Sequence, residues 1–78
     1  MREAVAQRFL RDAAISLTLM AELDLSEGDA AAAEPLIADA VTKHAQLAGA
    51  APTDVFILRD LSIAQNIHAS ALMRLNRN

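Results

Sequence analysis

Two histidines are the side chains in this sequence best suited to acid–base or metal chemistry. Neither His44 nor His68 has a second histidine or an acidic residue at the i and i+4 spacing of a compact metal site. Both fall among apolar residues at helical spacing, which favours a partly buried or rim histidine over a ligand or a general base. The absence of cysteine excludes disulfides, thiolate zinc sites and cysteine nucleophiles.

The hydroxyl side chains also lack the neighbours that catalysis requires. No base stands beside them in a readable motif, and no glycine-rich loop is present to hold a phosphate. The hydroxyl residues considered are Ser16, Ser26, Thr53, Ser62 and Ser70. We therefore predict no catalytic residue, no metal site and no cofactor, and a protein that is not an enzyme.

An Arg-Asp pair occurs twice, as Arg11-Asp12 and Arg59-Asp60, within a self-match at a spacing of forty-eight residues. Adjacent residues on a helix point in different directions, so neither pair bonds internally. We expect each side chain to reach a neighbouring helix or loop. The other matched positions are Leu10 and Leu58, Ile15 and Ile63, and Ala21 and Ala69. A repeated helix is the simplest cause of the match.

Composition indicates one small helical domain spanning residues 1–78. Hydrophobic residues make up 54% of the chain, but alanine supplies many of them and strong helix formers supply much of the rest. The net charge of −3 and the scattered basic residues argue against nucleic-acid binding, which needs clustered Lys and Arg. No uncharged run approaches the length of a membrane span, so we expect a soluble, cytoplasmic protein.

Apolar residues at steps of three and four predict three helices, at about 3–25, 30–48 and 54–76. Gly28 suits the left-handed residue after the first helix, Asp29 suits the cap of the second, and Pro52 prevents its continuation. The first helix has a broad apolar arc, which we expect two neighbouring helices or a partner chain to cover. One face of that arc is traced by Val5, Phe9, Ala13, Leu17, Met20 and either Leu23 or Asp24, and the arc is widened by Leu10, Ile15 and Leu19. The predicted fold is all-α, an antiparallel hairpin followed by a third helix.

The self-match resembles a tetratricopeptide repeat of the long-period bacterial type. Met20-Ala21 fill the family's large–small pair, Gly28-Asp29 its turn, and Ala33 and Ala40 its two small positions. Residues 11–18 and 59–66 are similar to the Arg-Asp-Leu-Ser opening of such repeats. The sequence departs from the pattern at Asp24, His68 and Asn76-Arg77. The resemblance implies one complete hairpin plus the first helix of a second repeat.

For such a repeat, the resemblance implies ligand contact in a groove lined by first helices. The matching groove positions are Thr18, Glu22, Ser26, Asn66, Ser70 and Arg74. The third helix lacks a partner helix, so we also expect an apolar interface on it, carried by Phe56, Ile63, Ile67 and Met73. The predicted function is protein–protein interaction, with another protein or with itself as a homodimer.

Three other hypotheses remain open at this stage. Asp24-Leu25-Ser26 at a helix end is superficially similar to the attachment site of acyl carrier proteins, although the residue order differs and the following helix is alanine-rich. Modification would then fall on Ser26. A three-helix DNA-binding domain is disfavoured by the acidity of the chain. The chain is alternatively a truncated fragment of a longer tetratricopeptide solenoid.

Overall fold

A computed structural model of the chain describes residues 2–76, with side chains from residue 5 onward. It contains α1 (Arg2–Ser26), α2 (Ala30–Ala50) and α3 (Val55–Asn76), and this part of the chain has no β-strand. The prediction of an all-α fold with three helices is confirmed. Each helix begins and ends within two residues of its predicted boundary.

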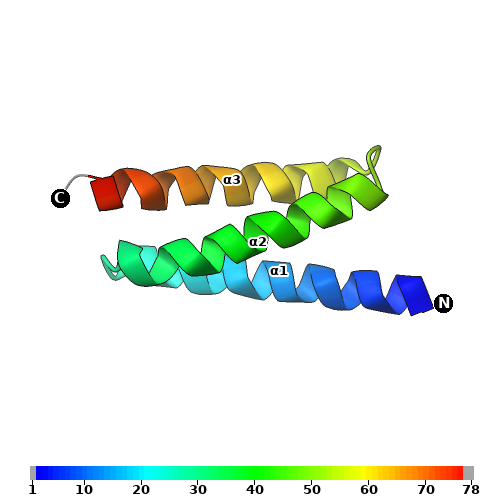
Figure 1. The fold of residues 1–78 in the computed structure, drawn as a ribbon, viewed down its shortest axis with the longest axis horizontal. Helices are drawn as coiled ribbons and strands as arrows, with labels where there is room; N and C mark the ends of the chain where they lie inside the picture. The colour runs from blue at the N-terminus through cyan, green and yellow to red at the C-terminus, as the bar shows by residue number, and fades with distance from the viewer. Residues whose placement is uncertain (1, 77–78) are drawn as a thin grey trace.

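The second helix packs against both of the others and runs antiparallel to them (Figure 1). As a result α1 and α3 run parallel, and they contact each other far less than either contacts α2. The molecule is elongated, with extents of 46 × 19 × 14 Å. This arrangement leaves one long side of α1 and one long side of α3 without a neighbouring helix.

The turn between α1 and α2 is closed by a pair of backbone hydrogen bonds around Gly28. The Gly28 amide donates to the Leu25 carbonyl at 3.0 Å, and the Asp29 amide donates to the Asp24 carbonyl at 2.8 Å. This is the Schellman pattern, which requires a left-handed residue, and Gly28 has φ +83°. The Asp29 carboxylate then accepts from the Ala32 amide at 3.0 Å and caps α2.

The two glycines give a matched test of this turn. A Cβ at Gly28 or at Gly49 would meet no atom within 4 Å, so only the backbone conformation distinguishes the two positions. We expect Gly28→Ala to destabilise the protein by about 1 kcal/mol, because alanine is strained at positive φ. Gly49→Ala, inside a helix, is expected to stabilise it by roughly 0.5 kcal/mol. Chemical denaturation measures both; equal effects at the two sites would contradict the assigned role of Gly28.

The connection between α2 and α3 depends on proline and a cap. Helix α2 continues through Gly49 and ends at Ala50. Ala51, which the following Pro52 keeps out of the helical conformation, still donates to the Leu47 carbonyl at 3.0 Å. The carboxylate of Asp54 accepts from the amides of Phe56 and Ile57 at 3.0 and 3.3 Å and begins α3. Asp54 is therefore the cap of the third helix.

Alanine dominates the core. Six alanines, two from each helix, are completely buried, and Ile37 is the one large side chain among the described residues with no exposed surface. Small side chains let the three helices approach closely but bury little apolar area each. The buried alanines are Ala14, Ala21, Ala33, Ala40, Ala64 and Ala71. The stability of the fold therefore depends heavily on the few large residues at its centre.

Much of the predicted apolar arc of α1 is left uncovered within the chain. Val5, Phe9, Met20 and Leu23 are all more than half exposed, whereas the buried side of α1 consists of Ala14, Thr18, Ala21 and Leu25. Within this chain no described helix covers these four residues, so of the two coverings expected for the arc, neighbouring helices or a partner chain, only the second stays a prediction for them. The physical reason is size: the smaller residues allow α2 to approach, and the larger ones remain on the far side.

Candidate functional site

A groove runs between the parallel helices α1 and α3, with α2 behind it, and two polar contacts cross it. One is the ion pair between Arg11 of α1 and Asp60 of α3, with 3.7 Å between guanidinium and carboxylate. The other is a hydrogen bond of 2.8 Å from the Arg74 guanidinium to the Leu25 carbonyl at the end of α1. The Arg11–Asp60 contact confirms the prediction for these two residues, whereas the exposed Asp12 and Arg59 form no ion pair within residues 5–76.

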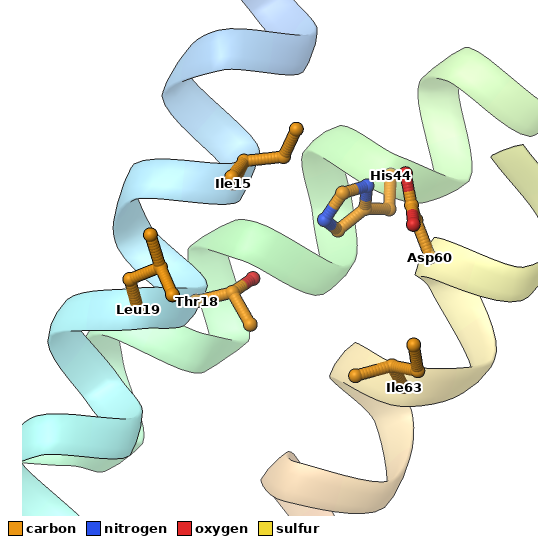
Figure 2. A pocket seen from close by; sticks show the side chains of 6 residues that line it. All are labelled: Ile15, Thr18, Leu19, His44, Asp60 and Ile63. Carbon is orange, nitrogen blue, oxygen red and sulfur yellow. The ribbon is translucent and has the colours of Figure 1, made fainter. Parts of the chain in front are cut away.

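The first of two hollows in this groove lies beside His44 (Figure 2). It has a volume of about 110 Å³. Its walls are mostly apolar, with α1 on one side, α3 on the other and the imidazole of α2 between them. The lining residues are Ile15, Thr18, Leu19, His44, Asp60 and Ile63. The hollow therefore combines an apolar surface with a single buried imidazole.

The imidazole of His44 is polar, only 2% exposed, and incompletely bonded. Its Nδ1 atom is buried without a hydrogen-bond partner among the described residues. Burial lowers the pKa of His44. The Asp60 carboxylate acts in the opposite direction and raises this pKa, while the Arg11 guanidinium lowers it further. His44 is accordingly neutral at pH 7. Figure 2 shows one ring nitrogen turned toward the hollow.

The second hollow lies further along the groove, toward the C-terminal ends of α1 and α3, and is larger, with a volume of about 450 Å³. It is lined by Glu22, Leu25, Ser26, Asn66, Ile67, Ser70 and Arg74. Five of the six residues predicted to face a groove are therefore brought together here. Hydroxyl, amide, carboxylate and guanidinium groups all reach this hollow, so it offers both donors and acceptors of hydrogen bonds.

The sixth predicted groove residue, Thr18, lies in the first hollow instead. It is 8% exposed, and its hydroxyl donates to the Ala14 carbonyl at 2.8 Å. Since that hydrogen bond stays within α1, Thr18 contributes mainly its methyl group to the hollow.

Residues forty-eight positions apart face the same hollow from opposite sides. Ile15 and Ile63 both line the first hollow, while Glu22 faces Ser70 and Ser26 faces Arg74 in the second. The internal sequence match is thus also a match in position, because α1 and α3 present equivalent sides to one groove.

The four residues predicted as an apolar interface on the third helix divide between two places. Ile63 and Ile67 line the groove, and Ile67 also packs against the core. Phe56 and Met73 are 64% and 58% exposed. The apolar surface of α3 is therefore partly the wall of the groove and partly a separate outward side.

The sequence did not predict Ile15, Leu25 or Asp60 as site residues, and it also missed His44 and Leu19. Both are apolar-stripe positions in the sequence, and nothing local indicates that they meet across three helices. The one available signal for the hollow was the Ile15–Ile63 pair of the self-match. His68, in contrast, lies outside the groove, with its Nε2 3.2 Å from the Glu34 carboxylate across the α2–α3 interface.

Candidate metal-ligand clusters and membrane-spanning helices are both absent from the described part of the chain. No group of three or more His, Asp or Glu side chains there could hold a metal ion, and no helix there is long and apolar enough to cross a membrane. The Ser26 hydroxyl, the site of the carrier-protein alternative, donates to the Leu23 carbonyl at 2.7 Å.

Comparison with known proteins adds no relative to these observations. No protein-family model, curated protein or solved structure matches the chain. The relation to tetratricopeptide repeats therefore remains a prediction that rests on the sequence motifs. The function has to be inferred from the groove itself.

Proposed function

We propose that the chain is a non-enzymatic protein–protein interaction module whose groove between α1 and α3 binds a polypeptide segment of a partner protein. The observation that supports this most is the alignment of the two hollows along one groove, one apolar and one polar. A polypeptide segment carries both kinds of group at regular spacing. The sequence motifs support the same function, because the family they resemble uses this surface for ligands.

The first hollow suits a branched aliphatic side chain of the partner. A dry cavity of about 150 Å³ lined by apolar side chains holds a molecule as large as benzene, so a hollow of about 110 Å³ fits a somewhat smaller group. Ile15, Leu19 and Ile63 supply the apolar contacts. Their exposure in the free protein means that a bound side chain would remove apolar surface from water on both partners.

The second hollow suits the backbone and polar side chains of the same segment. Each peptide group has one hydrogen-bond donor and one acceptor. In the hollow, Glu22 can accept hydrogen bonds, and Asn66 and Arg74 can donate them. The Arg74 guanidinium uses one of its five N–H groups for the Leu25 carbonyl, which leaves others for a ligand. Its anchoring by that bond reduces the entropy lost when a ligand binds.

Selection from a random peptide library displayed on phage tests this proposal directly. We expect the wild-type protein to enrich peptides that contain a leucine-type residue. When such a peptide is added, the NMR resonances of the protein that shift should be those of amides around the groove. Ile63→Glu places a charge in the wall of the apolar hollow and is expected to weaken binding about tenfold or more in calorimetric titrations.

Gln46→Glu is the matched control, since it adds the same charge on the exposed side of α2. Its binding should equal that of the wild type. Recovery of no peptide, or equal binding by the Ile63→Glu variant, would contradict the groove as the binding site.

A further inference from the structure

The internal repeat reveals which side of α1 is left uncovered. The side of α3 that packs on α2 includes Ala64 and Ala71, which are fully buried, and Ile57 and His68, which are partly buried. Their counterparts forty-eight residues earlier are Phe9, Ser16, Met20 and Leu23, and all four are exposed. We name these four residues the α1 outer face. It is the side of α1 that corresponds to a helix-packing side of α3.

The converse holds for α3. The side of α1 that packs on α2 contains Leu10, Ala14, Ala21 and Leu25. The corresponding residues of α3 are Leu58, Ser62, Ala69 and Met73, which are all exposed. We name these the α3 outer face. Each of the two equivalent helices thus has two sides suited to helix packing. Helix α2 covers one of these sides on α1 and the other, non-equivalent side on α3.

The charges beside the two outer faces are opposite. Asp12 borders the α1 outer face and Arg59 borders the α3 outer face, both exposed, and neither forms an ion pair within residues 5–76. Their repeat counterparts, Asp60 and Arg11, do pair across the parallel helices α1 and α3. The described residues therefore present two surfaces that complement each other in charge and are both suited to helix packing.

We propose that a second copy of this chain covers these surfaces, with the α3 outer face of one copy packed on the α1 outer face of the next, the two helices parallel. Arg59 of the first copy then lies at the height of Asp12 of the second, as Arg11 does beside Asp60 within one chain. Contacts of α1 with α1 or of α3 with α3 would bring like charges to both sides of the interface, which disfavours two-fold pairing.

Such a contact is heterologous, so it leaves one free α1 outer face and one free α3 outer face at the ends of every assembly. Assemblies therefore grow beyond the dimer as concentration rises. Neither outer face includes a residue that lines the two hollows. Self-association and peptide binding are thus separable, and failure of one leaves the other standing.

Light scattering after size-exclusion chromatography tests the contact. The mean mass of the wild type is expected to rise with concentration from tens to hundreds of micromolar. Phe9→Glu blocks the α1 outer face and Met73→Glu the α3 outer face; both residues are exposed, so both variants should fold, as circular dichroism would verify. Each variant alone is expected to stay monomeric, with association weakened about tenfold or more.

Mixing the two variants distinguishes the proposed contact from a two-fold one. Phe9→Glu retains its α3 outer face and Met73→Glu its α1 outer face, so the mixture should form a one-to-one dimer that does not grow. Self-association of either variant alone at wild-type strength would overturn the proposal, as would a mixture that remains monomeric. A wild type that is monomeric at every concentration would also overturn it.

The charges provide a second test in which the apolar surfaces are unchanged. Asp12→Arg and Arg59→Asp should each weaken association, because each places like charges across the interface, and the double variant should restore it. A double variant as weak as the single ones would contradict the pairing of Arg59 with Asp12. Gln46→Glu again serves as the control and should associate as the wild type does.

Discussion

Replacing Ile37 by alanine is expected to lower the free energy of unfolding by about 3 kcal/mol, within the range of 2 to 5 kcal/mol measured for such core truncations. Ile37 has no exposed surface and packs among buried alanines of all three helices. Those alanines have no side-chain freedom with which to fill the space left behind. The melting temperature should therefore fall by about 10 °C or more, as followed by circular dichroism.

Ile63→Ala is the matched control because the residue type is the same and Ile63 is 41% exposed. It is expected to lower the free energy of unfolding by about 1 kcal/mol or less, since less buried apolar surface is lost than at Ile37 and alanine favours the helix. Ile37→Val should fall between the two, at about 1 kcal/mol. A cost for Ile37→Ala no larger than for Ile63→Ala would contradict the central role of Ile37.

Local signals made the helix boundaries predictable from sequence. Gly28 and Asp29 act within a few residues of themselves, through a left-handed backbone and a carboxylate that accepts a nearby amide. Pro52 and Asp54 act over the same short range at the next turn. Such effects depend on covalent geometry and neighbouring backbone groups, so a single sequence contains the information they need.

The groove residues were predictable for a different reason, the self-match. Once α1 and α3 are treated as equivalent, any two matched positions must occupy corresponding places on parallel helices. Glu22 and Ser70, and Ser26 and Arg74, do so and line one hollow. The match could not predict the rotation of α2 about its axis, so the position of His44 in the groove was not foreseen.

The packing side of α1 could not be obtained from hydrophobicity alone. Both sides of the helix are apolar, and the larger residues Phe9 and Met20 lie on the exposed one. What decides between them is the close approach that Ala14 and Ala21 permit, a property of the helix pair and not of one helix. The same ambiguity is what leaves α1 with a second side fit for packing.

His44→Leu is expected to leave the protein at least as stable as the wild type at pH 7. The buried Nδ1 of His44 has no hydrogen-bond partner among the described residues, and a buried unsatisfied polar atom costs about 1 to 3 kcal/mol. Leucine removes that atom and keeps an apolar group between Ile15 and Ile63. Chemical denaturation at pH 7 measures the difference.

The advantage of the leucine variant should widen in acid. Burial lowers the pKa of His44 below its usual value of 6.5, against the opposing effect of Asp60 and with that of Arg11. Below pH 6.5 the unfolded chain therefore binds a proton at this histidine that the folded protein does not bind. As the pH is lowered further, the free energy of unfolding decreases until the pKa of His44 in the folded protein is reached. A single proton accounts for at most about 1.4 kcal/mol per pH unit.

Unfolding of both proteins at pH 7.5, 6.5 and 5.5 isolates this proton, in steps of about one unit around the usual histidine pKa. Comparing the two proteins at the same pH attributes the change in their difference to the His44 site, because His44→Leu is the only substitution between them. Little change in that difference is expected from pH 7.5 to 6.5, and an increase from 6.5 to 5.5. A difference independent of pH, or a His44 imidazole whose NMR titration lies at or above pH 6.5, would show that Asp60 outweighs burial at this site.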